Sequence, residues 1–392
     1  MDAVPGDTVT PWRLMQGVMF SALALLLVLF CWHIEVAKLL PGTAPDSLFG
    51  LPLGDFPNLW CAGLLARHGE LATLYNADLF QAWKARAFGH AVTQTPWIYP
   101  PLALPLGAAL SALPLRAAFV VWELGTLGVM AWLLRQAGLS WAVVVLGGLC
   151  PAEWLCLIYG QYGGIISCLL FAGLSLAERR PVAAGIMLGL AALKPQTGLL
   201  VPVAWVAQGR LRAMLTAALV CAALAGLPVL LFGWGSWALF FREAAPVAKA
   251  LVDAPFGQGY QLTGTSVFWM MRSFGLSCAV ADAAQICTAL LAVVAAYWLW
   301  RREGDRLVQA SLTMLLALFV APYGFSADMV GYGVALAVLA QRRGWRVSLL
   351  DGLFWLWPGY AALVTQLTGL LLTPLVVALA LFMGIRQARR PA

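Results

Sequence analysis

The run Val182–Val206, VAAGIMLGLAALKPQTGLLVPVAWV, contains a single charged residue. That residue is Lys194 at the centre of the run, and Pro195, which disfavours an uninterrupted helix, follows it. Basic residues flank the run on both sides, with Arg179-Arg180 before it and Arg210 after it. Since basic loops face the cytoplasm, a single crossing would leave one of these clusters outside. We therefore predict two half-length helices that meet at Lys194 on the outer side, Val182–Leu193 and Gln196–Val206.

The composition of the whole chain excludes a soluble domain. Of 392 residues, 62% are hydrophobic and 10% charged, and the mean hydropathy is +0.85, whereas a soluble domain carries roughly 25% charged residues. Apolar runs recur to the end of the chain without the period of two that a β-barrel needs. We expect an all-α polytopic membrane protein, a single membrane domain over residues 1–392 with about 12 transmembrane helices. The candidate segments are Leu14–Val36 (an uncleaved first span), Pro100–Leu113, Ala117–Leu134, Trp141–Ile158, Gly163–Ala177, Val182–Val206, Ala213–Phe232, Cys278–Trp300, Leu307–Val320, Met329–Ala340, Ser348–Leu363 and Leu367–Ile385.

The net charge of +7 comes from short basic clusters at the ends of apolar segments. This is the positive-inside pattern, so these clusters are predicted in the cytoplasm and no nucleic-acid partner is expected. No CxxC pair occurs among the eight cysteines, which argues against a zinc site or a disulfide framework. The five clusters are Arg179-Arg180, Arg210 with Arg212, Arg301-Arg302 with Arg306, Arg342-Arg343 with Arg346, and Arg386 with Arg389-Arg390.

Two sizeable regions lie outside the predicted spans, a first exterior loop at residues 40–98 and a second exterior region at residues 233–275. In the first, Pro57 suits the opening turn of a short helix that follows Asp55. A second short helix is predicted over Ala77–Phe88, with Leu79, Phe80 and Trp83 on one side and Gln81, Lys84 and Arg86 on the other. Both read as amphipathic and too short to span, so they are predicted to lie in the membrane interface.

Four stretches in order carry a family resemblance: GDFPNLWCAGLLARHGELATLYNADLF from Gly54, WIYPPLALPLGAALSALPLRAAFVVWEL from Trp97, GQYGGIISCLL from Gly160, and GLAALKPQTGLLVPVAWVAQGRLRA from Gly189. Together they resemble glycosyltransferase family 87, membrane enzymes of the GT-C fold that use polyprenyl-phosphate-mannose. The resemblance implies transfer of a hexose, mannose in the first instance, from a polyprenyl-phosphate donor to a glycolipid or glycan acceptor at the outer side of the inner membrane. It also puts Asp55 at the position of the proposed catalytic base. Some members use late-loop histidines, but no histidine follows His90 here, so that role is not carried over.

Inverting transfer from a sugar phosphate needs a carboxylate to accept the acceptor's proton and cations to hold the departing phosphate. Asp55, at a membrane–water boundary before a helix, is the candidate base; its alternatives are a helix N-cap or a solvated acid of the loop. Lys194 is the candidate phosphate ligand, because a cation in an apolar run usually pairs or lines a functional cavity. The alternatives for Lys194 are an ion pair with a membrane acid such as Glu153, or snorkelling to the surface.

Five further residues are candidate donor- or substrate-binding groups. Gln161 lies between two apolar segments and next to glycines that permit close approach of a ligand. Asp328 and Tyr323 occupy a polar break on the predicted outer side, where Asp328 is equally compatible with a helix cap. Tyr99 belongs to the rigid aromatic lead Trp97–Pro101, and Arg272 could steer an anionic lipid phosphate.

No metal-ligand spacing, DxD, Walker A, GxGxxG or nucleophile elbow occurs, so neither a metal nor a cofactor is predicted and a nucleotide-sugar donor lacks support. A polyprenyl-linked sugar flippase or transporter is the main alternative. A transporter usually shows paired halves, whereas the large exterior loop here is early and has no later counterpart. A polymerase or ligase of lipid-linked glycans is expected to carry its large loop late. The position of the loop therefore favours a multi-pass transferase of the inner membrane, in contact with membrane lipids, whose site faces the periplasm.

Overall fold

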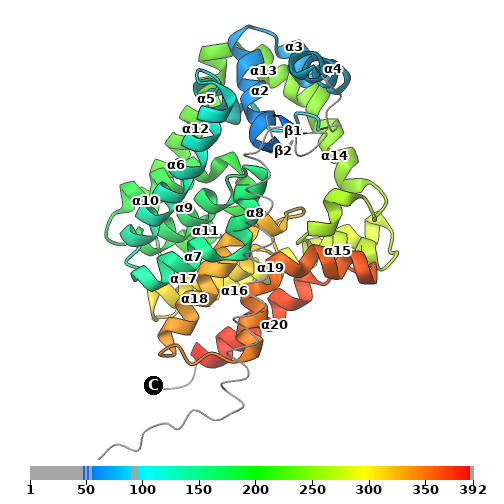
Figure 1. The fold of residues 1–392 in the computed structure, drawn as a ribbon. Coiled ribbons are helices and arrows are strands. Elements are labelled where there is room, and N and C mark those ends of the chain that lie inside the picture. The colour runs from blue at the N-terminus through cyan, green and yellow to red at the C-terminus, as the bar shows by residue number, and fades with distance from the viewer. Residues whose placement is uncertain (1–46, 49–50, 53–54, 90–94, 389–392) are drawn as a thin grey trace, which may run out of the picture.

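The computed structural model describes residues 47–48, 51–52, 55–89 and 95–388, and the predicted first span, Leu14–Val36, lies outside them. The described chain is helical apart from a two-residue antiparallel pair, β1 (Ser47–Leu48) and β2 (Leu51–Pro52). Figure 1 shows α3, α4 and α13 at one end of the molecule and α20 towards the other. The prediction of an all-α protein is thus confirmed for the described residues, apart from this short strand pair.

The first exterior loop forms three helices: α2 (Asp55–Arg67), α3 (Leu71–Tyr75) and α4 (Ala77–Phe88). The α4 boundaries are those predicted, because Asn76 caps the first turn by accepting from the Leu79 amide and Gly89 ends the helix with a φ of 74°. The amphipathic interpretation of α2 is wrong, since nine of its thirteen residues are buried and no polar face is left. Lys84, assigned by its pattern to the polar side of α4, is 1% exposed.

Small residues set the position of α2. After Pro100 the chain forms two short consecutive helices, η1 (Pro101–Ala103) and α5 (Leu104–Leu110). α5 packs against α2 with Gly63 facing Gly107, and a Cβ added at Gly63 would lie 1.9 Å from the Gly107 carbonyl carbon. The two backbones can approach this closely only because both residues lack a side chain. The candidate span Pro100–Leu113 is therefore a pair of short helices over Pro101–Leu110, which is not among the helices long enough to cross a membrane.

Within the described residues, three helices are long and apolar enough to cross a membrane: α6 (Leu115–Gln136), α12 (Leu211–Phe232) and α16 (Cys278–Arg301). A fourth crossing arises if α7 (Trp141–Leu149) and α8 (Pro151–Tyr159) count as one span, but these two are bent by 52° at Cys150. The candidate Trp141–Ile158 is therefore not one continuous helix, because Pro151 opens a new helix inside the run. Outward-facing apolar side chains, such as Leu230 at 85% exposure on α12, suit a lipid environment.

The predicted break at Lys194 is confirmed. After α9 (Gly163–Leu176), the chain forms α10 (Pro181–Leu190), the short turns η2 (Ala191–Leu193) and η3 (Pro195–Thr197), and α11 (Leu200–Ala207). Lys194 stands between the two turns with a non-helical φ of −128°. Glu178, just before α10, forms an ion pair of 3.3 Å with Arg210, just after α11. The start of α10 and the end of α11 therefore lie on the same face of the molecule, as the flanking charges predicted.

The same face collects other basic clusters. Glu178 also pairs with Arg306 at 3.1 Å, and Arg342 pairs with Asp305 at 2.9 Å. Arg180 donates to Gln136 at the end of α6. We call the surface that holds these residues the basic face; its members are Glu178, Arg180, Arg210, Asp305, Arg306 and Arg342. It joins four of the five predicted clusters, as expected if they share one side of the membrane.

The remaining elements complete the bundle and the second exterior region. That region is helical rather than extended and includes one π-helical turn, η4. The elements are α13 (Gly235–Leu239), η4 (Phe240–Ala244), α14 (Ala245–Asp253), η5 (Gly259–Thr263), α15 (Val267–Ser273), α17 (Arg306–Ala317), η6 (Ser326–Met329), α18 (Val330–Arg342), α19 (Leu349–Thr368) and α20 (Thr373–Ala388).

Candidate active site

Asp55 is the first residue of α2 and the centre of a polar contact inside an apolar surrounding. Its Oδ1 accepts a hydrogen bond from the Tyr99 hydroxyl at 3.1 Å, and its Oδ2 accepts one from the Gln161 side-chain amide. The next residue, Phe56, is fully buried and its ring lies 5.3 Å from that of Phe119 and 6.0 Å from that of Trp122. This aromatic anchor fixes the start of α2 and with it the carboxylate.

Lys194 lies at the break between the half-helices, and its side chain faces Asp328. Its Nζ donates to Asp328 Oδ1 at 2.6 Å and to Gln161 Oε1 at 2.8 Å. The Tyr162 ring lies 4.9 Å from the same nitrogen, within reach of a cation–π interaction. The side chains of Lys194 and Asp328 are 8% and 6% exposed, so this is a buried ion pair. The alternative partner, Glu153, is not used.

Gln161 connects these two centres. Its amide nitrogen donates to Asp55 and its amide oxygen accepts from Lys194, so one side chain bridges the candidate base and the candidate phosphate ligand. The preceding Gly160 ends α8 with a φ of 64°, and a Cβ there would lie 2.2 Å from the Phe56 Cβ. Only glycine fits this left-handed, crowded position. The Trp122 indole donates to the Gly160 carbonyl at 3.1 Å and holds the turn that presents Gln161.

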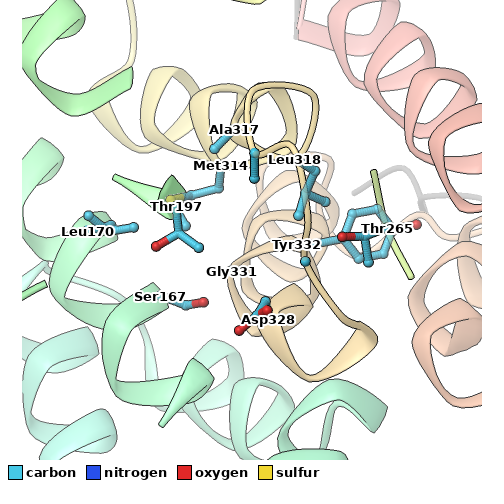
Figure 2. Close-up of a pocket in the computed structure, with 12 residues that line it drawn as sticks. Ser167, Leu170, Thr197, Thr265, Met314, Ala317, Leu318, Asp328, Gly331 and Tyr332 are labelled. Carbon is cyan, nitrogen blue, oxygen red and sulfur yellow. The ribbon is translucent and has the colours of Figure 1, made fainter. Parts of the chain in front are cut away.

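Asp328 is placed by its own turn. Its Oδ2 accepts from the Phe325 amide at 3.1 Å, and the neighbouring Ala327 carbonyl accepts from the Cys156 thiol at 3.1 Å. Asp328 is not itself the N-cap of a helix: it is the third residue of η6, where its carboxylate accepts from the amide of the N-cap residue Phe325, and it is also the partner of Lys194. Its carboxylate also borders a pocket together with hydroxyl groups of Ser167 and Thr265, while Leu170, Met314 and Leu318 supply apolar walls (Figure 2).

The other candidates divide into near and distant. Tyr99 belongs to the network through its hydrogen bond to Asp55. Tyr323 is near the network and is 38% exposed. Burial raises the pKa of the Tyr323 hydroxyl, while the Lys194 charge lowers this pKa and the Asp328 charge raises it. Arg272 lies at the end of α15, where it donates to the Leu276 carbonyl at 2.8 Å. Among the described contacts none joins Arg272 to the network, and its role in steering a lipid phosphate stays a prediction.

Burial and hydrogen bonding act against each other on the Asp55 carboxylate. Removal from water raises its pKa above the usual value, while the Lys194 charge and the hydrogen bonds from Tyr99 and Gln161 lower it. The net direction is upward. A carboxylate with a raised pKa is a better proton acceptor, which suits a general base.

Sequence reasoning gave no substrate-binding role to two residues of this region, Tyr162 and Glu153. Tyr162 follows Gln161, and its ring faces the Lys194 ammonium. An aromatic residue at the start of a helix has no sequence pattern that would indicate such a contact. Glu153 is 2% exposed, packs against Gly164, and its Oε2 has no hydrogen-bond partner among the described residues. Within the same residues, no group of three or more His, Cys, Asp or Glu could hold a metal ion, and metal independence stays a prediction.

Comparison with known proteins identifies a family. The family model of glycosyltransferase family 87 matches residues 97–322, more than half of the 392-residue chain. The matched range includes Tyr99, Gln161 and Lys194, whereas Asp55 precedes it and Asp328 follows it. No curated protein and no solved structure matches.

Proposed function

The chain belongs to glycosyltransferase family 87, and we propose that it transfers a hexose, mannose in the first instance, from a polyprenyl-phosphate donor to a glycolipid or glycan acceptor. The proposed reaction inverts the anomeric centre, needs no cofactor, and takes place at the periplasmic side of the inner membrane within a GT-C-type fold. Asp55 is the proposed general base and Lys194 the proposed phosphate ligand.

The observation that carries this proposal is the bridge through Gln161. A base and a phosphate ligand must meet one sugar ring together, since they act on opposite sides of its anomeric carbon. In the structure a single amide separates the Asp55 carboxylate from the Lys194 ammonium. The two residues come from segments 139 positions apart, so their convergence is a property of the fold.

The chemistry follows from these positions. The acceptor hydroxyl oxygen attacks the anomeric carbon while Asp55 takes its proton. The bond between the anomeric carbon and the phosphate oxygen breaks, and its electron pair leaves on the polyprenyl phosphate. Lys194 stabilises the charge that develops there. The donor phosphate competes for Lys194 with Asp328, which keeps the buried ammonium paired until the donor arrives.

The basic face supports the proposed orientation. α9 starts beside Gln161 and ends near Glu178 of the basic face, and its 14 residues correspond to about 21 Å at 1.5 Å per residue. The network therefore lies at the opposite end of the bundle from the basic face. With the basic face in the cytoplasm, the network faces the exterior.

The test is transfer by the purified protein with a panel of polyprenyl-phosphate hexoses and a membrane glycolipid fraction as acceptor. We expect a new glycosidic bond whose anomeric configuration, read by NMR, is opposite to that of the donor. The same protein in proteoliposomes should not move the sugar lipid between leaflets. Translocation without bond formation would instead support the flippase alternative.

A further inference from the structure

Lys84 is a buried cation outside the network. It lies on α4, is 1% exposed, and its Nζ donates to Asn58 Oδ1 at 3.2 Å, to the Thr95 carbonyl at 2.8 Å and to Thr95 Oγ1 at 2.8 Å. An ammonium has three N–H donors, so all of them are used. The Phe80 ring lies 4.5 Å away. Among the described residues, no carboxylate pairs with Lys84.

The partners of Lys84 place it between the two segments that supply Asp55 and Tyr99. Asn58 lies one helical turn after Asp55 on α2, so the two residues share a face of the helix. Thr95 is four residues before Tyr99, in the extended lead whose Pro96 carbonyl accepts weakly from Asn58 at 3.5 Å. The Tyr99–Asp55 hydrogen bond depends on the relative position of these two segments.

Burying a lysine to connect α2 with the segment at Thr95 costs desolvation free energy. Its desolvation lowers the pKa of the ammonium to about 8, and the neutral oxygens around it return no charge. An apolar side chain of similar length would fill the same volume without this cost. What the lysine adds is three hydrogen bonds from its Nζ, one to Asn58 on α2 and two to Thr95.

We propose that Lys84 is a positioning residue for the active site: its ammonium ties the first turn of α2 to the lead at Thr95 and so holds the Asp55 carboxylate against the Tyr99 hydroxyl. This inference rests on the proposed function for its effect on catalysis, but the tie itself is a structural claim with its own readout.

The test uses Lys84→Met in the full-length protein in nanodiscs, with Lys249→Met as matched control. Lys249 lies on α14 with its side chain 76% exposed, so the control removes the same group from a surface. We expect Lys84→Met to lower kcat about tenfold to a hundredfold and to leave the donor KM within about twofold, since Lys194 is untouched. Hydrogen exchange should become faster in peptides covering residues 55–59 and 95–103.

A double-mutant cycle tests whether Lys84 acts through the Tyr99–Asp55 bond. If Tyr99→Phe and Lys84→Met each cost about tenfold, the double variant should also cost about tenfold, because the second change removes nothing further. Multiplicative losses of about a hundredfold would overturn the proposal. Unchanged exchange at both segments would overturn it as well.

The milder Thr95→Val removes one acceptor and keeps the shape of the side chain, so it gives a smaller change in the same direction if Lys84→Met does not fold. A wild-type kcat with wild-type exchange in Thr95→Val would count against the tie. Failure of the proposed function is distinguishable: full transfer by Asp55→Asn would refute the base while leaving the exchange result unaffected.

Discussion

The ion pair between Lys194 and Asp328 gives a quantitative prediction. Both side chains are over 90% buried and 2.6 Å apart. Asp55 adds a third charge through Gln161, so the ionised cluster holds two carboxylates and one ammonium. Its net charge is −1. The two partners of the ion pair are therefore not equivalent, and removing each should have a different cost.

Asp328→Asn leaves one ammonium facing one carboxylate, a net charge of zero. Lys194→Met leaves two carboxylates without a cation, a net charge of −2. Breaking a buried pair costs about 3–5 kcal/mol, and we place Lys194→Met at the upper end and Asp328→Asn at or below the lower end. At roughly 2.1 cal/mol/K per residue, 392 residues have an unfolding entropy of about 0.8 kcal/mol/K. Lys194→Met should thus lower Tm by about 6 °C and Asp328→Asn by about 4 °C or less.

The assay is thermal unfolding of the purified variants followed by tryptophan fluorescence. The double variant Lys194→Met/Asp328→Asn removes one of the stranded carboxylates and should unfold at a higher temperature than Lys194→Met alone. Lys249→Met, which breaks an exposed pair with Asp253, should stay within about 1 °C of the wild type. A Tm for Asp328→Asn at or below that of Lys194→Met would refute the charge count.

Three other changes test the connections around Asp55. Gln161→Leu removes both bridging hydrogen bonds and should lower kcat/KM about tenfold to a hundredfold in a steady-state transfer assay; wild-type kinetics would contradict the bridge. Tyr99→Phe removes a hydrogen bond that lowers the Asp55 pKa, so the pKa rises further, and because a base is lost as pH falls through its pKa, the acid limb of the kcat/KM profile should move to higher pH. A limb that stays in place or moves to lower pH would refute that assignment. Gly160→Ala adds a Cβ 2.2 Å from Phe56 at a φ of 64° and should destabilise the fold by about 1–3 kcal/mol or more in denaturant unfolding; unaltered stability would show that the turn can relax.

The break at Lys194 could be predicted because charge and hydropathy disagree there. A single crossing would satisfy hydropathy but would separate Arg179-Arg180 from Arg210, and two half-helices resolve the conflict. The Glu178–Arg210 ion pair confirms that resolution. The bend at Cys150 carried a similar signal in Pro151, but hydropathy alone treats an apolar proline as part of the run.

Long-range pairing was beyond the reach of the sequence. Lys194 and Asp328 were both candidates, yet nothing in a linear pattern joins residues 134 positions apart, and Glu153 was the nearer acid considered. Lys84 shows the same limit. A lysine on an amphipathic helix is usually solvated, and its burial depends on acceptors at Asn58 and Thr95, 26 and 11 positions away. The extra helix α3 is only five residues long and lacks a periodic pattern to reveal it.

The central claim is that the Asp55 carboxylate is the base of a sugar transfer at the site shared with Lys194. Its most direct test is the rate of radiolabelled hexose transfer from a polyprenyl-phosphate hexose by purified Asp55→Asn. A general base contributes about 10²–10⁴-fold, so the account predicts a loss of that size with donor binding retained. Transfer by Asp55→Asn at the wild-type rate would contradict it.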